Sequence, residues 1–295
     1  MPGPLAIGWV GVGAMGAPMA RRVAAAGFDV AIYDKDPLRL SSLSGSSALR
    51  VSMTVQEALS EADVAVLMVA TPAQAEDVLF SSPGAMTSMR PGTVVLVMAT
   101  VGPDAISSWA SRLAGRRVSI VDAPVSGGTA RAESGELLAM VGGEADAVAR
   151  VSPVLSAMAN NIVVVGPAPG DGQRMKLVNQ LLCGVHVAVA GEALAFAEAL
   201  GLEARQCWEV LRQGAAVSFM FEDRGARMLD EKFEPPRSAL DIFVKDLSLV
   251  QRAARNAGFS APLAGTAEQI FLSGHRAGLG RLDDSVVIEI MRGRT

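Results

Sequence analysis

The feature that most constrains the fold is a glycine fingerprint near the N-terminus. A short apolar run at residues 5–10 predicts a strand, and residues 17–27 predict a helix closed by glycine. Between them stands a G-x-G-x-x-G pattern, Gly11-Val12-Gly13-Ala14-Met15-Gly16. In a strand–turn–helix unit the first glycine allows a tight turn, the second lets a pyrophosphate approach the backbone, and the third lets helix and strand pack closely. The pattern therefore predicts a dinucleotide phosphate site at the helix N-terminus.

The next predicted strand ends at Tyr33 and is followed directly by Asp34. An acidic side chain at this point can accept hydrogen bonds from the adenosine ribose hydroxyls, and it repels a 2′-phosphate. The alternative is that Asp34 caps a helix before Pro37. The sequence therefore favours NAD over NADP, although Lys35 and Arg39 leave room for the phosphorylated cofactor.

The length of 295 residues suits two domains. Half of the residues are hydrophobic and only 4% are aromatic, which fits parallel strands and closely packed helices better than a β-sandwich. Further strands are predicted at residues 62–69, 93–98, 118–121, 137–141 and 162–165. Beyond residue 166 the pattern is helical throughout. We therefore expect an α/β protein: a Rossmann doubly wound sheet that binds NAD at residues 1–165, and an all-α domain for substrate binding and dimerisation at residues 166–295.

Charge and composition argue against several classes of function. The formal net charge is −4 with both signs interspersed, unlike a nucleic-acid or membrane-surface binder. Cys183, Cys207, His186 and His275 have no metal-ligand spacing, so no metal site is expected. Reduced cysteines suit a cytoplasmic protein. His186 reads as a core histidine and His275 as part of a loop. The apolar stretch 181–200 predicts a packed helix, within a subunit or between the subunits of a homodimer or homotetramer, and not a membrane span.

One lysine stands out in the helix predicted from Gly170 to about residue 200. Lys176 lies near the start of this helix, and at about 100° per residue Asn179 and Gln180 share its face. A cation beside two amides, on a face too apolar for solvent, indicates a functional site. The alternative is a lysine that snorkels to solvent at a domain boundary.

Two shorter motifs carry polar groups among apolar neighbours. Ser126-Gly127-Gly128 follows a predicted strand, and its backbone N–H groups and hydroxyl can form an anion-sized nest. The alternative is an ordinary Gly-Gly turn. Lys245-Asp246 lies in a predicted helix, where the alternative is a surface ion pair.

In chain order, four segments resemble the β-hydroxyacid dehydrogenase family, whose members include 3-hydroxyisobutyrate dehydrogenase and tartronate semialdehyde reductase. They are the glycine fingerprint with the four residues after it, Asp122 to Gly128, Gly170 to Gln180, and Phe243-Val244-Lys245-Asp246. The resemblance covers essentially the whole chain. Within the family, residues 176–182 and 238–247 look most like L-threonate dehydrogenases.

The resemblance implies NAD-dependent oxidation of a small hydroxycarboxylic acid, L-threonate or a similar acid, with Lys176 as acid/base. It implies that substrate is bound by Ser126, Gly127, Gly128, Asn179 and Gln180. It implies that the glycine fingerprint, with Tyr33 and Asp34, contacts the cofactor. Five further contacts are implied: Val69, Ala70, Gln74, Thr100 and Lys245. Gln180 replaces an asparagine that the family commonly has, which favours the threonate-like branch. Ala99 stands where relatives often carry serine.

Burial of Lys176 would lower the pKa of its amine from about 10.4 toward working pH, so that it could accept the hydroxyl proton as hydride leaves the carbinol carbon. Two other functions stay open. One is an NADPH-dependent reductase of a small semialdehyde acid, of the tartronate or succinic semialdehyde type. The other is a non-catalytic NAD-binding protein, which would leave Lys176 and the glycine nest without a role.

Overall fold

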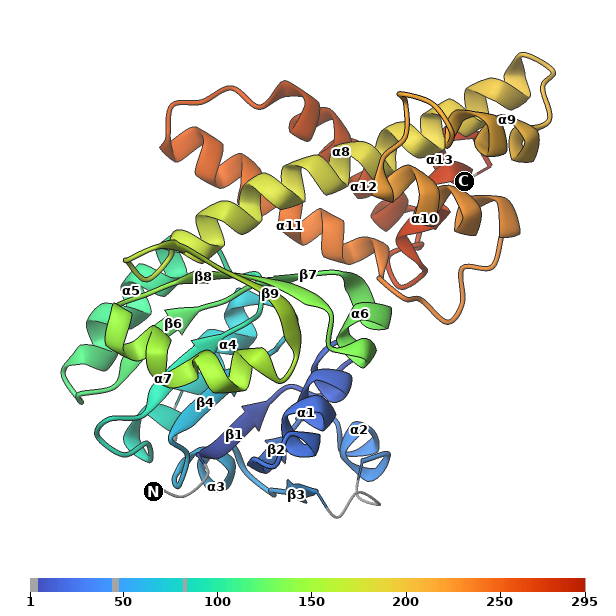
Figure 1. The fold of residues 1–295 in the computed structure, drawn as a ribbon. Coiled ribbons are helices and arrows are strands. Elements are labelled where there is room, and N and C mark those ends of the chain that lie inside the picture. The colour runs from blue at the N-terminus through green and yellow to red at the C-terminus, as the bar shows by residue number, and fades with distance from the viewer. Residues whose placement is uncertain (1–4, 44–47, 82–83, 295) are drawn as a thin grey trace. The chain divides into compact units, whose positions relative to one another are not determined.

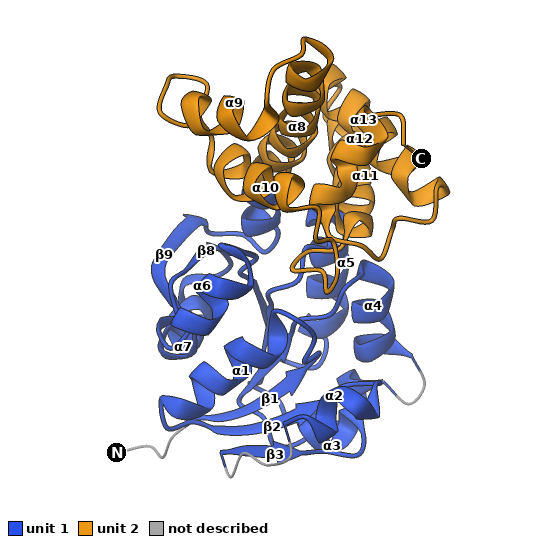
Figure 2. Ribbon diagram, turned by 90° about the vertical axis from the view of Figure 1, so that its right-hand side faces the viewer, with its two compact units in different colours: residues 1–176 blue, residues 177–295 orange. Residues whose placement is uncertain are grey.

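The computed structural model describes residues 5–43, 48–81 and 84–294. The chain divides into two compact units, residues 1–176 and residues 177–295, which are coloured separately in Figure 2. The long helix α8, Asp171–Ala199, starts in the first unit and continues into the second. The strands all belong to the first unit.

Unit 1 is built on a nine-stranded sheet within the described residues (Figure 1). Its strands are β1 (Ala6–Val10), β2 (Asp29–Tyr33), β3 (Leu49–Val51), β4 (Val64–Leu67), β5 (Val94–Val97), β6 (Ser119–Asp122), β7 (Val125–Ser126), β8 (Leu137–Gly142) and β9 (Ala159–Gly166). Their order is β3-β2-β1-β4-β5-β6-β8-β7, and β9 pairs with β8. Strands β1 to β6 pair in parallel, whereas β8 runs antiparallel to β6 and β7. The chain order reverses between β1 and β4, and open α/β sheets bind ligands at such a switch point.

Helices cover both faces of this sheet. They are α1 (Gly16–Ala25), α2 (Pro37–Ser41), α3 (Val55–Leu59), α4 (Pro72–Phe80), the 3₁₀ turn η1 (Ala85–Thr87), α5 (Pro103–Ala114), α6 (Gly128–Ser134) and α7 (Ala145–Ser156). Successive strand residues point to opposite faces. Trp9 therefore packs into a core with α1, α6 and α7, and Val10 into a second core with α3, α4 and α5. This arrangement confirms the predicted doubly wound fold.

Unit 2 is helical, as predicted. Beyond α8 its elements are α9 (Ala204–Leu211), α10 (Phe219–Asp230), α11 (Leu240–Asn256), α12 (Pro262–Arg276), the 3₁₀ turn η2 (Asp284–Val286) and α13 (Val287–Met291). By length and composition alone α8 could cross a membrane, and 44% of its most apolar window is buried. Its Val187 and Leu194 lie in the core of the unit, together with the stacked rings of Phe243 and Phe271, whose centroids are 5.0 Å apart.

His275 was predicted to lie in a loop, and this prediction is wrong. It stands in the last turn of α12, and its Nδ1 lies 2.7 Å from Oδ1 of Asp241. The preceding Gly274 suggested a helix end. Gly274 is instead a buried packing position, because a Cβ there would lie within 2.8 Å of Leu240 and Ile290 side-chain atoms. Its missing side chain lets α12 approach its neighbours closely.

Candidate active site

The glycine fingerprint forms a loop held tightly by the ends of three neighbouring strands. Gly11 has φ of +96°, donates its N–H to the Tyr33 carbonyl at 2.9 Å, and would place a Cβ 2.4 Å from the Met68 carbonyl oxygen. The indole of Trp9 donates to the Gly11 carbonyl at 3.0 Å. A Cβ at Gly16 would lie 2.0 Å from the same carbonyl oxygen. Two of the three glycines are therefore required by the fold itself.

Asp34 joins this loop to the end of β2. Its two carboxylate oxygens each accept a backbone N–H at 2.9 Å, one from Val12 and one from Asp36. Asp34 does not cap the following helix, because the N-cap of α2 is Asp36. The guanidinium of Arg39 lies 3.6 Å from Asp34 and 3.3 Å from where a Cβ of Gly13 would stand. A basic side chain thus covers the position at which the sequence predicts a ribose and a pyrophosphate.

Three of the predicted cofactor contacts follow β4: Val69 and Ala70 lie in the loop, and Gln74 lies in the first turn of α4. Thr71 caps helix α4 by accepting the Gln74 N–H at 3.2 Å. The Gln74 side chain turns back and accepts the Ala70 N–H at 2.9 Å. Gln74 therefore fixes the backbone of this loop beside the switch point.

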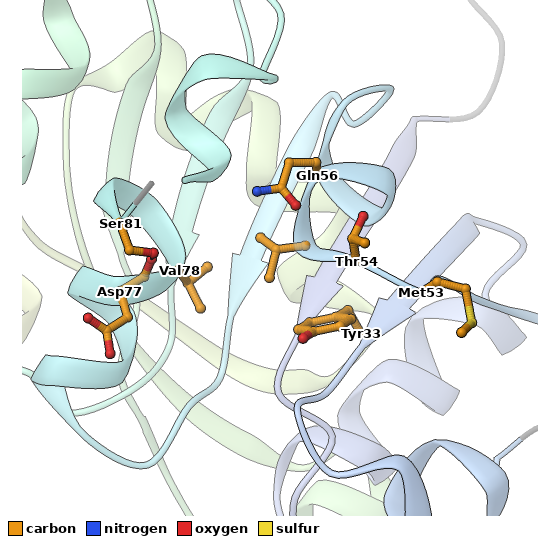
Figure 3. Close-up of a pocket in the computed structure, with 8 residues that line it drawn as sticks. Tyr33, Met53, Thr54, Gln56, Asp77, Val78 and Ser81 are labelled. Atoms are coloured by element: carbon orange, nitrogen blue, oxygen red, sulfur yellow. The ribbon is translucent and has the colours of Figure 1, made fainter. Parts of the chain in front are cut away.

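A hollow of about 230 Å³ opens beside the end of β2 (Figure 3). Figure 3 shows the Tyr33 ring and the Val78 side chain on opposite sides of it. The hollow is lined by Tyr33, Met53, Thr54, Val55, Gln56, Asp77, Val78 and Ser81. Only Tyr33 was predicted as a site residue. Because this volume is below the roughly 300–1,000 Å³ of pockets for whole drug-sized ligands, it suits one ring system of a larger ligand.

Lys176 and the glycine nest lie together within unit 1. The Lys176 side chain is 7% exposed, and its Nζ donates to the Val125 carbonyl at 2.8 Å. Val125 and Ser126 form β7, and the next residues, Gly127 and Gly128, have φ of +140° and +73°. A buried, hydrogen-bonded amine excludes the alternative of a lysine that snorkels to solvent. The amine is held at the residue directly before Ser126.

Asp122, to which the sequence alone assigns no role, holds the start of α8. It is fully buried at the end of β6, and its carboxylate oxygens accept the Gly170 and Gln173 N–H groups, both at 2.6 Å. Burial raises the pKa of this carboxyl from 3.8 to about 6, against the opposing effect of the two N–H donors. Asp122 thus anchors the helix that carries Lys176.

Gln173 is a second positioning residue, and the sequence alone does not reveal it. It is fully buried, and its Oε1 accepts the Val101 and Gly102 N–H groups at 2.9 and 3.0 Å. Its Nε2 donates to the Ala99 carbonyl at 3.0 Å. These bonds bracket Thr100, a predicted cofactor contact. The signal available in the sequence was the spacing of three between Gln173 and Lys176, which puts both on one helix face.

We expect Asp122 to make stability depend on pH. The folded state binds this proton more tightly than the unfolded state, so the group favours folding increasingly as pH falls from above 6 toward 4. Relative to Asp122→Asn, the wild type should gain about 2 kcal/mol of unfolding free energy between pH 8 and pH 4.5. Urea unfolding of both proteins at pH 8 and pH 4.5 measures this. A difference in unfolding free energy that stays constant with pH would contradict it.

In unit 2, Asn179 and Gln180 belong to a polar chain that reaches α11. Asn179 donates through Nδ2 to Gln180 Oε1 at 2.8 Å, and Gln180 donates through Nε2 to Asp246. Lys245 Nζ lies 2.7 Å from the other Asp246 oxygen. Asp246 is 2% exposed, so the alternative of a surface ion pair is excluded. Among the described residues, no group of three or more His, Cys, Asp or Glu could hold a metal ion.

Two protein-family models match the chain almost end to end. The NAD binding domain of 6-phosphogluconate dehydrogenase matches residues 6–166. The NAD-binding domain of NADP-dependent 3-hydroxyisobutyrate dehydrogenase matches residues 170–291. Both halves of the chain therefore correspond to dehydrogenase domains.

Individual relatives agree with these matches. L-threonate dehydrogenase of Cupriavidus necator is 40% identical over 287 residues, which are 97% of this chain and 96% of that protein. L-threonate dehydrogenase of Escherichia coli K12 is 37% identical over 98% of this chain and 95% of its own length. The crystal structure of 3-hydroxyisobutyrate dehydrogenase from Salmonella typhimurium superposes with a TM-score of 0.91 at 38% identity, covering 97% of this chain and 99% of that one.

Proposed function

The chain belongs to the 3-hydroxyisobutyrate dehydrogenase family of NAD(P)-binding oxidoreductases, and from this premise we propose that it oxidises L-threonate or a similar small hydroxyacid with NAD. The predicted family, enzyme class and cofactor class are confirmed by the matches above. The observation that best supports the proposed reaction is the buried Lys176 amine, bonded to the residue directly before the Ser126-Gly127-Gly128 nest. The relatives named L-threonate dehydrogenase support the choice of substrate.

The residues present fit a dinucleotide cofactor. Gly13 leaves the loop backbone open except for the guanidinium of Arg39, and the Asp34 oxygens have further lone pairs for ribose hydroxyls. The hollow beside Tyr33 and Val78 would take the adenine ring. When bound, the cofactor supplies the hydride acceptor.

The chain's own residues would handle the proton and the carboxylate. The Ser126 hydroxyl and the N–H groups of Gly127 and Gly128 would hold the substrate carboxylate. Lys176, as a neutral amine, would take the proton of the substrate hydroxyl as the carbinol carbon becomes a carbonyl, and would return it in reduction. The Val125 carbonyl fixes the direction of Nζ without adding a counter-charge.

A screen of hydroxyacids of four carbons or fewer, with NAD and with NADP, tests the proposal through the absorbance of the reduced nicotinamide. We expect L-threonate with NAD to give the highest kcat/KM. A protein that reduces NAD with none of these acids would refute the proposed reaction.

A second candidate is reduction of a small semialdehyde acid by NADPH. It is supported by Arg39, a basic side chain at the ribose position, and by the family match to an NADP-dependent enzyme. If kcat/KM for such a semialdehyde with NADPH exceeded that for every hydroxyacid with NAD, this second function would replace the first.

Arg39→Ala should sharpen the preference for NAD. A guanidinium that binds a 2′-phosphate makes a charge-assisted bond worth about 1.5–3 kcal/mol, so its removal should lower kcat/KM with NADP by roughly tenfold or more. The value with NAD should change less than about twofold, since Arg39 is half-exposed and, among the described residues, pairs only with Asp34 and Asp36. Arg21→Ala, an exposed change on α1, is the matched control. Equal losses with both cofactors would show that Arg39 does not discriminate between them.

A further inference from the structure

A buried carboxylate in unit 2 sets the direction of a series of hydrogen bonds that ends on helix α8. Asp246 of α11 accepts from Gln180 Nε2, and Gln180 Oε1 accepts from Asn179 Nδ2 at 2.8 Å. The same Nδ2 also lies 3.4 Å from Cys183 Sγ. Asp246 and Gln180 are 2% and 7% exposed, so water does not compete freely for these bonds.

The direction of the series follows from the chemistry of its first member. An ionised carboxylate can only accept, so the Gln180 amide must turn its nitrogen toward Asp246. The Gln180 oxygen then faces Asn179, so Asn179 must donate a hydrogen bond to it through its own amide nitrogen. The consequence is that Asn179 Oδ1 points away from the series, and it accepts no hydrogen bond from the described residues. The Asp246 carboxylate thereby leaves Asn179 Oδ1 available as a hydrogen-bond acceptor.

Asn179 follows Lys176 by three residues and therefore lies on the same side of α8. An outward amide oxygen fits a hydrogen-bond donor, and a hydroxyl is a donor whereas a carboxylate is not. The Ser126-Gly127-Gly128 nest offers donors and suits the carboxylate.

We infer that Asp246 is a positioning residue that makes Asn179 accept from a second hydroxyl of the substrate, beyond the one oxidised. The preferred substrates are then polyhydroxy acids. This inference rests on the proposed function and adds to it the group that Asn179 recognises.

The length of the Gln180 side chain is part of this arrangement. Gln180 and Asp246 bond directly in the structure. Asparagine, which the family commonly has at this position, is one methylene shorter and would fall short of Asp246 by about 1.5 Å with the backbone unchanged. The glutamine therefore links Asn179 to α11.

The first test compares Asp246→Asn with the wild type on L-threonate and on 2- and 3-hydroxybutanoate, which keep a single hydroxyl each. An amide at 246 can donate or accept, so the direction of the series is lost. We expect kcat/KM for L-threonate to fall about tenfold, mostly through KM, with less than about twofold change for the hydroxybutanoates. Asp241→Asn, on the same helix but paired with His275, is the matched control and should change neither.

The second test is a rescue that a merely structural role would not produce. Gln180→Asn alone shortens the amide and should lower the preference for L-threonate by the same factor. Adding Asp246→Glu lengthens the partner by one methylene and should restore that preference. Thermal unfolding of each variant shows that the compared proteins are folded.

The outcomes separate the inference from the function it rests on. If Asp246→Asn lowers kcat/KM equally for all three acids, or if the double variant shows no rescue, the inference is wrong while the dehydrogenase activity stands. If the wild type oxidises none of the acids, the proposed function fails and the inference fails with it. A selective loss on L-threonate with rescue supports both.

Discussion

Lys176→Met should bind the dinucleotide normally and lose most of its turnover, by about 10²- to 10⁴-fold in kcat. Methionine keeps the length and apolar stem of lysine, so the buried path to Val125 stays filled. What disappears is the amine that is proposed to take or return the hydroxyl proton. The measurement is kcat at saturating substrate and cofactor, together with the dissociation constant of NAD from fluorescence titration.

Lys232→Met is the matched control, because Lys232 is exposed two residues beyond the end of α10. It should keep wild-type kcat and wild-type NAD affinity. If Lys176→Met retained a kcat within about threefold of the wild type, proton transfer would have to be assigned to another group. Loss of NAD affinity in the same variant would instead place Lys176 at the cofactor.

Gly13→Ala should fold normally and bind NAD roughly 100-fold more weakly. A Cβ at Gly13 would meet only the guanidinium of Arg39, at 3.3 Å, and that flexible side chain can move aside. The methyl group would stand where the glycine pattern predicts that the pyrophosphate approaches the backbone. An unrelieved overlap of this kind costs about 1–3 kcal/mol, which corresponds to a large loss of affinity.

Gly16→Ala, the same substitution three residues later, should instead lower the stability of the fold. Its Cβ would lie 2.0 Å from the Gly11 carbonyl oxygen, a backbone atom that cannot move aside alone. We expect roughly 3 kcal/mol of lost unfolding free energy, measured by urea denaturation without cofactor. Equal stability losses in the two variants would show that the two glycines do not have separate roles.

The architecture of unit 1 was accessible from the sequence because its signals are local. A glycine fingerprint between an apolar run and a helix, and further apolar runs of four to eight residues, predict the parallel strands. The short strands β3 and β7 were not predicted, since three and two residues show no periodicity. The helix around His275 was misjudged because Gly274 acts through packing, which sequence does not display.

The candidate site was accessible in part. Lys176 and the Ser126-Gly127-Gly128 nest stood out individually as polar groups in apolar surroundings, and a family resemblance linked them. The anchoring residues did not stand out, because their partners are distant in the chain. Asp122 bonds to a residue 48 positions away, and Gln173 to residues 71 to 74 positions away. Such pairings are set by the fold and produce no recognisable spacing of residues in the sequence.

The three hydrogen bonds of the Gln173 side chain have a consequence for how ligands meet this protein. The strand-end segment around Thr100 and the first turns of α8 are fastened to one fully buried amide, so neither can shift without breaking bonds that no solvent replaces. The amine of Lys176 is thereby held in register with that segment from the moment the chain folds. A ligand that binds at this proposed site would meet side chains that are already aligned, so little of its binding free energy would be spent on ordering them.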